Sequence, residues 1–172
     1  MGIMDGANVE KLEVEQVPVL INLVALARYD QSPEFPIQMM TMGRLTPLSG
    51  ERAILEYEED LEDPDSGDTA KAQVRLLLTP KRVTMIRTGE YENTMVFAPG
   101  QRYEGPYTTP YGEMQMALMA KEVTCRAGSE KGSVHLKYDI HFQGAYASTN
   151  ELHLAYSTDS ARGYTRDSKP VT

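Results

Sequence analysis

The region between residues 112 and 142 constrains the fold of this chain most, because apolar and polar side chains alternate along it. Its first half places Met114, Met116, Leu118 and Ala120 on one side and Glu113, Gln115, Lys121 and Val123 on the other. After a glycine-bounded turn at residues 128–132, polar and apolar positions alternate from Ser133 to Phe142. Successive side chains of a strand point to opposite faces, so the pattern predicts a β-hairpin with one buried and one solvated face.

Turn signals recur along the rest of the chain. Three Thr-Pro pairs, Thr46-Pro47, Thr79-Pro80 and Thr109-Pro110, each lie between two strand-like runs, and proline presets the backbone for the second position of a turn. No long stretch shows the period of a helix, so the pattern indicates an all-β sandwich or barrel. The expected strands cover residues 17–28, 37–45, 51–59, 71–78, 82–88, 93–97, 101–108, 113–126, 133–143 and 151–156.

The length of 172 residues suits one domain that buries enough surface to fold without a metal or a disulfide. We expect a lead-in at residues 1–16, the β domain at 17–156 and a mobile tail at 157–172. The single cysteine, Cys125, cannot form an intramolecular bridge, which fits a reducing compartment. Because the sequence also lacks a signal-like N-terminus and a run of about 20 apolar residues, we expect a soluble, cytoplasmic protein.

The net charge of −8 opposes contact with phosphate backbones and anionic lipid, so we expect neither nucleic acid nor a membrane as a partner. Much of the negative charge lies between Glu56 and Asp68. The spacing of Asp63, Asp65 and Gly67 does not match that of a calcium-binding loop. We therefore interpret residues 56–68 as a solvated loop between two strands, outside the barrel or sandwich.

Four short pieces of the sequence carry a family resemblance. They are Ile54-Leu55-Glu56-Tyr57-Glu58-Glu59, Ile86-Arg87-Thr88-Gly89, Thr109-Pro110-Tyr111-Gly112-Glu113 and Tyr138-Asp139-Ile140-His141. In this order they resemble the YwiB-like proteins of bacteria, a family of uncharacterised, small calycin-like β-barrels. The resemblance runs from about Pro18 to Tyr156 and implies a single antiparallel up-and-down, lipocalin-like barrel of about ten strands. It implies no activity, because the family has none established.

The inward positions of such a barrel are mainly apolar, and we expect Met40, Met114 and Met116 among them. A barrel of this size is either filled by its side chains or holds one small ligand. Methionines adapt to irregular shapes, which suits a ligand pocket. The same flexibility suits an imperfectly packed core, and this is the simpler interpretation.

Polar side chains on the inner face are the candidate ligand-binding residues. Arg87 continues the inward parity of its strand, so its guanidinium can fork onto a carboxylate or phosphate of a ligand at the barrel mouth. Alternatively, Arg87 reaches water at the rim or pairs with a carboxylate of a neighbouring strand, which is the simpler interpretation. Tyr57, Tyr138 and Tyr156 offer hydroxyls that either orient a ligand or bond to the backbone.

The histidines do not form a convincing metal site in the sequence. His135 and His141 share the polar face of one strand, and His153 is opposite His141 only in some registers. Because zinc needs three or four convergent ligands, we expect a solvated strand face there and no bound metal or cofactor. Cys125 has no histidine at a suitable spacing, and no nucleophile elbow or phosphate loop is present, so we expect a protein that is not an enzyme.

Two functions of different class remain. The first is a carrier or sensor that binds a small amphipathic or acidic ligand inside the barrel, with Arg87 at the mouth and Tyr138 along the wall. The second is a non-enzymatic interaction module with a filled barrel that uses a strand edge or outer face to bind a protein partner. The state of the barrel interior discriminates between the two.

Overall fold

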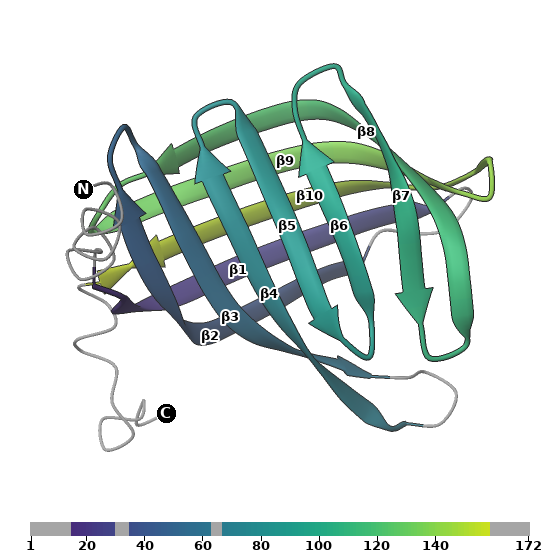
Figure 1. The fold of residues 1–172 in the computed structure, drawn as a ribbon, viewed down its shortest axis with the longest axis horizontal. Coiled ribbons are helices and arrows are strands. Elements are labelled where there is room, and N and C mark those ends of the chain that lie inside the picture. Colours follow the sequence, from purple (N-terminus) through teal and green to yellow (C-terminus); the bar gives the residue numbers. More distant parts are fainter. Residues whose placement is uncertain (1–14, 30–34, 63–66, 159–172) are drawn as a thin grey trace, which may run out of the picture.

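The computed structural model describes residues 15–29, 35–62 and 67–158, and these residues form ten β-strands (Figure 1). The strands are β1 (Val17–Tyr29), β2 (Phe35–Leu48), β3 (Arg52–Glu62), β4 (Thr69–Thr79), β5 (Arg82–Gly89), β6 (Glu92–Phe97), β7 (Arg102–Thr109), β8 (Gly112–Ala127), β9 (Lys131–Phe142) and β10 (Ala145–Ser157). Most of the predicted lead-in and tail, residues 1–14 and 159–172, lies outside the described residues. No helix in the described part of the chain is long and apolar enough to cross a membrane.

Each strand pairs antiparallel with its neighbours in sequence, and β1 also pairs with β10, so the sheet closes into a barrel. This topology confirms the predicted all-β, up-and-down barrel of about ten strands. Every expected strand is found, and the largest difference is at β10, which begins at Ala145 and not at Glu151. The alternation of side chains was sufficient to locate the strands, because each strand buries one face in the barrel and exposes the other.

Three local predictions are wrong. Pro47 does not lie in a turn. It lies inside β2, opposite Ala53 of β3, and the turn between these two strands begins two residues later. Residues 56–62 are not part of a loop, because they pair with β4 from Arg75 back to Thr69. In β8, the register shifts by one residue at Lys121, so Val123 returns to the core side and not to the wet side. A bulge of this kind reverses the parity of every later residue in its strand.

Two neighbouring strand pairs are joined over only part of their length. The pairing of β2 with β3 stops at Gly43 and Tyr57, although β2 extends back to Phe35 and β3 forward to Glu62. β6 and β7 share only two partner pairs, Glu92 with Thr108 and Asn93 with Tyr107, and Figure 1 shows these strands separating beyond them. Gly43 is required where β2 turns away, because a Cβ there would lie 2.6 Å from the carbonyl oxygen of Glu56.

The two ends of the barrel differ in how well they are packed. We call the end at which β3 begins and β10 ends the closed end, and the opposite end the open end. Inward side chains near the closed end, such as Val19, Leu45 and Leu55, are fully buried. Inward side chains near the open end, such as Met39 and Ile140, pack against the same core but are only partly buried. The hydrophobic core therefore fills the barrel from one end and leaves the other accessible to solvent.

Candidate functional site in the open end of the barrel

A row of inward-facing residues crosses the sheet from β3 to β7 near the open end. Tyr57 is paired with Val74, Val74 with Arg87, Arg87 with Asn93, and Asn93 with Tyr107. Four of these five side chains end in a polar group. Polar groups inside a barrel are costly unless they find hydrogen-bond partners, so this row is the first place to look for function.

Glu59 of β3 neutralises Arg87 of β5 inside the barrel. Arg87 Nε donates to Glu59 Oε2 at 2.7 Å, and the two side chains are only 14% and 16% exposed. The intervening strand β4 places Ala72 opposite Glu59, and this small side chain leaves room for the guanidinium to reach across. Arg87 Nη1 donates to Asn93 Oδ1 at 3.1 Å. The arginine is thus held by a carboxylate from two strands away and by an amide from the next strand.

The electrostatics of this cluster keep its charges paired and its hydroxyls neutral. Burial acts to lower the pKa of Arg87, but the adjacent carboxylate of Glu59 more than offsets it, so the guanidinium stays charged. Burial raises the pKa of Tyr138 to about 12 and also raises the pKa of Tyr57 and of Tyr107, although the charge of Arg87 opposes these shifts. Three protonated tyrosines therefore surround one ion pair at neutral pH.

One polar group in the cluster has no partner. Asn93 is 7% exposed, and its Nδ2 donates to no acceptor among the described residues, although its Oδ1 accepts from Arg87. A buried donor without an acceptor costs about 1–3 kcal/mol, so such groups are rare in folded proteins. The Asn93 N–H group therefore lacks a hydrogen bond and is enclosed, so a ligand or a water molecule can satisfy it only after the surrounding side chains move.

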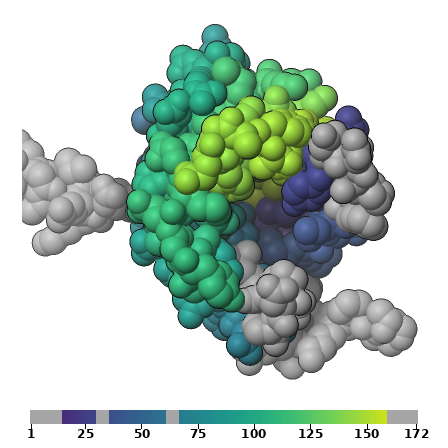
Figure 2. Space-filling model, turned by 90° about the vertical axis from the view of Figure 1, so that its right-hand side faces the viewer, coloured from purple at the N-terminus to yellow at the C-terminus, as the bar shows by residue number. Residues whose placement is uncertain are grey.

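Partly buried apolar side chains and rings lie near the same end of the barrel. They include Met39, Tyr107, Ile140 and Phe142, all of which are partly buried and pack against the core. The ring of Tyr107 meets the edge of the Phe142 ring, with 5.5 Å between their centroids. Figure 2 views this end of the barrel and shows a hollow between β10, in yellow-green, and the purple and blue strands β1 and β2. The site therefore combines an apolar wall with a polar, internally neutralised floor.

The structure brings together some of the predicted site residues. Arg87 points inward as its parity predicted, and it is close enough to Tyr57 and Tyr138 for its charge to act on the pKa of both tyrosines. Met114 points inward and is partly buried near the open end, whereas Met116 is fully buried in the core. The placement fits the simpler interpretation of Arg87 as an arginine that pairs with a carboxylate, because its charge is already paired with Glu59. Its binding of a ligand stays a prediction.

Two predicted site residues lie elsewhere. Met40 is 60% exposed on the outer face, because the inward residues of β2 are the odd-numbered ones, including Met39 and Leu45. The prediction that Met40 faces the interior is wrong. Tyr156 is buried at the closed end, where its hydroxyl donates to the backbone carbonyl of Gly128 at 2.6 Å. It therefore does not line the open end.

Sequence reasoning missed Glu59 and Asn93, although both follow a visible pattern. Glu59 has the inward parity of Leu55 and Tyr57, but the acidic residues after it suggested that the strand had ended. Asn93 has the inward parity of Met95 and Phe97 in β6. Polar residues that continue an apolar alternation are the signal that could have identified this pair.

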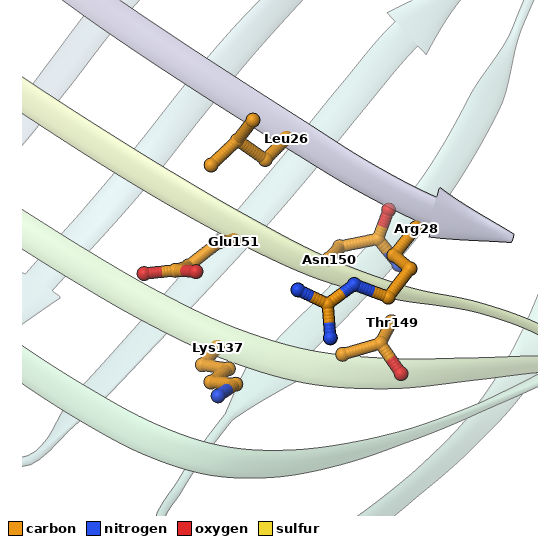
Figure 3. Close-up of a pocket in the computed structure, with 6 residues that line it drawn as sticks. All are labelled: Leu26, Arg28, Lys137, Thr149, Asn150 and Glu151. Atoms are coloured by element: carbon orange, nitrogen blue, oxygen red, sulfur yellow. The ribbon is translucent and has the colours of Figure 1, made fainter. Parts of the chain in front are cut away.

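The outer face of β9 and β10 carries a second polar group of residues. His153 lies opposite His135 and not opposite His141, whose partner is Tyr146. The imidazoles of His135 and His153 stack with their centroids 4.1 Å apart. A small neighbouring pocket of about 30 Å³ is lined by Leu26, Arg28, Lys137, Thr149, Asn150 and Glu151 (Figure 3). Its volume is enough for about two water molecules, so it does not hold a larger ligand.

Comparisons with known proteins identify the family but not an activity. The family model described as "Domain of unknown function (DUF1934)" matches residues 21–154, so the chain belongs to this family. A solved structure, the ywiB protein from Bacillus subtilis, is similar with a TM-score of 0.71 and 19% sequence identity. The match covers 86% of this chain and 96% of that chain, and at this identity it shows the shared fold alone. No curated protein matches the chain.

Proposed function

We propose that the protein is a non-catalytic binding barrel that holds a small amphipathic molecule in its open end. The observation that carries the proposal is the unpartnered Nδ2 of Asn93, buried beside the Arg87–Glu59 ion pair. The partly buried wall of Met39, Ile140 and Phe142 lies at the same end and would contact the apolar body of the ligand. Pockets that bind small molecules typically combine an apolar lining with a few placed polar groups.

The charge of the site favours an uncharged head group over a carboxylate. Glu59 already neutralises Arg87, so a bound carboxylate would leave one uncompensated negative charge in a poorly solvated place. The protein is also acidic overall, with a net charge of −8. An amide or ketone oxygen would accept from Asn93 without adding charge. We therefore place amphiphiles with a neutral acceptor ahead of the acidic ligand that the sequence suggested.

A matched series of ten-carbon probes tests this proposal. Decanamide, decanol and decanoic acid share the apolar chain and differ in the head group, and binding to the tag-free protein can be followed by calorimetry and by melting temperature. We expect decanamide to bind more tightly than decanoic acid. Asn93→Ala should weaken decanamide binding about fivefold, as for loss of one hydrogen bond. Thr94→Ala, one residue along β6 with the opposite parity, should not. If no probe binds, or if Asn93→Ala binds decanamide unchanged, the proposal is wrong.

A free strand edge favours a second candidate, self-association. Residues 35–42 of β2 pair with β1, but no described strand pairs with their other edge. This segment carries no charge in an otherwise acidic protein, and Met40 is 60% exposed on it. Two copies could therefore pair these edges antiparallel without charge repulsion, as in other strand-edge associations.

Light scattering over a range of concentrations tests self-association directly. We expect a dimer in the parent protein and a monomer for Met40→Lys, because a lysine on an exposed edge opposes pairing. Tyr111→Lys, which changes a similarly exposed residue in the turn before β8, should leave the dimer intact. A parent protein that is monomeric at about 100 μM would exclude this candidate, since edge pairing of biological relevance should be populated there.

A further inference from the structure

Three side chains converge on the outer face of β9 and β10, away from the barrel interior. His135 and His153 are directly opposite each other, and Glu151 lies two residues before His153, on the same face. Glu151 Oε2 lies 3.1 Å from Nε2 of His135 and 3.2 Å from Nε2 of His153. The three ligand atoms all lie within 4.8 Å of one another. Two imidazole nitrogens and one carboxylate oxygen, all of them possible metal ligands, thus lie close together.

We propose that His135, His153 and Glu151 form a binding site for a divalent transition-metal ion with the preferences of zinc. Zinc binds histidine nitrogen and carboxylate oxygen at about 2.0–2.2 Å, and tetrahedral geometry then separates neighbouring ligand atoms by roughly 3.3 Å. The two measured nitrogen–oxygen distances are already close to that value. Because the two imidazole planes are stacked at an interplanar angle of 16°, both rings must turn before their Nε2 lone pairs meet at one ion, and a water molecule then completes the fourth position. The site is independent of the proposed ligand in the barrel.

Glu122 of β8 lies near one of these histidines. Its Oε1 lies 4.0 Å from Nδ1 of His135. When the ion binds Nε2, the ring proton resides on Nδ1 and can be donated to Glu122 after a small approach. A carboxylate behind a metal-binding histidine fixes the ring and makes it a better ligand.

The surroundings of the site allow an ion to enter, and their charges influence how tightly it binds. The side chains of His135, Glu151 and His153 are 29%, 34% and 50% exposed, so an ion reaches them from solvent. The strand neighbours are Thr124 of β8 beside His135 and Val24 of β1 beside His153. Near Glu151 lie two further charged groups: Lys137, its partner in β9, and Arg28, which lines the same small pocket. Their positive charges moderate the affinity but do not occupy the histidine nitrogens.

The chain is well suited to a test, because it contains only three histidines and His141 is a control for the other two. Tag-free, chelator-treated protein is titrated with zinc chloride, and with magnesium chloride as a hard-ion control, by calorimetry and melting temperature. We expect one zinc ion per chain and, at a hundredfold excess over Kd, a rise in melting temperature of roughly 5 °C or more. His141→Gln should behave as the parent, whereas His153→Gln and Glu151→Gln should each bind zinc at least tenfold more weakly. Magnesium should give no shift.

Cobalt supplies a readout that does not depend on stability. A tetrahedral site with nitrogen and oxygen ligands should give visible absorption bands in the parent and in His141→Gln but not in His153→Gln. Binding should weaken below about pH 6, because protonated imidazoles cannot bind metal. Absence of zinc binding in the parent would overturn the proposal, as would unchanged binding in His153→Gln. If His153→Gln does not fold, His135→Gln provides the same test from the other strand.

Discussion

The closed end and the open end of the barrel are built from the same ten strands but treat polar groups differently. Near the closed end, Leu45, Leu55 and Val83 are fully buried, and the hydroxyl of Tyr156 bonds to the backbone of Gly128. Near the open end, the interior holds the Arg87–Glu59 ion pair. An apolar interior stabilises the fold through burial, whereas an internal ion pair carries a desolvation cost that its own attraction has to offset.

The difference indicates which end of the barrel contributes most to stability and which end is available for a function. The closed end contributes dense packing, which is what a core requires, although the hydroxyl of Thr158 just after β10 is buried without a hydrogen-bond partner among the described residues. The open end contains partly exposed apolar side chains and the unpartnered Asn93 amide, neither of which stabilises the folded chain by itself. A site for a ligand is expected where the structure departs from what stability alone would select.

The strongest test of the comparison is a cavity made at each end. Leu55→Ala at the closed end should lower the free energy of unfolding by about 3 kcal/mol, because the fully buried leucine leaves a cavity. Met39→Ala at the open end should cost only about 1 kcal/mol, because its site is already partly exposed. Urea unfolding measures both. Equal losses would show that the two ends are packed alike.

The ion pair itself provides the next largest effect. Glu59→Ala should destabilise the protein by roughly 2–3 kcal/mol, because it leaves the charge of Arg87 buried without a partner. Glu58→Ala is the matched control, since Glu58 is the adjacent residue on the outer face and bonds to Gln73 and Lys71 in solvent. It should cost less than about 1 kcal/mol. If the two variants lose the same stability, the open end is wetter than the burial of Arg87 implies.

A single hydrogen bond tests the closed end. Tyr156→Phe removes the bond from the hydroxyl to the carbonyl of Gly128, whose length is 2.6 Å, and should lower the free energy of unfolding by about 1 kcal/mol. Tyr111→Phe is a control on a highly exposed ring and should change little. Chemical denaturation of the two variants compares them. A loss below the error of that measurement would mean that water replaces the tyrosine hydroxyl at this end.

The strands could be predicted from the sequence because the signal for them is local, whereas the closed barrel rested on the family resemblance and only part of the candidate site could be predicted. Alternation predicted all ten strands and the inward direction of Arg87, since both depend only on parity. Parity gave the wrong face for Met40, because the residues of β2 alone do not show which of its faces points inward. It also gave the wrong face for residues after the bulge at Lys121. The partner of Arg87 was missed because Glu59 is two strands away, and no local pattern reveals which strand ends meet.

A polar group on the outer face of β10 should have the smallest effect on stability, and it is a reference for the polar groups inside both ends of the barrel. Hydrogen bonds with His135, and then with His153, lower the pKa of Glu151. A carboxyl group whose pKa is lower in the folded than in the unfolded protein stabilises the fold at pH values above its ordinary pKa. This stabilisation is lost as the pH falls through the lowered pKa. The side chain of Glu151 is 34% exposed and lies on the outer face, where solvent screens its charge, so the contribution should be only a few tenths of a kcal/mol. Unfolding of metal-free parent and Glu151→Gln should therefore differ slightly at pH 6 and converge towards pH 3, with Glu104→Gln as a surface control. A difference above about 1 kcal/mol would show that a polar group on the outer face can stabilise the protein as much as one inside the barrel. Burial alone would then not explain how much each group contributes to stability.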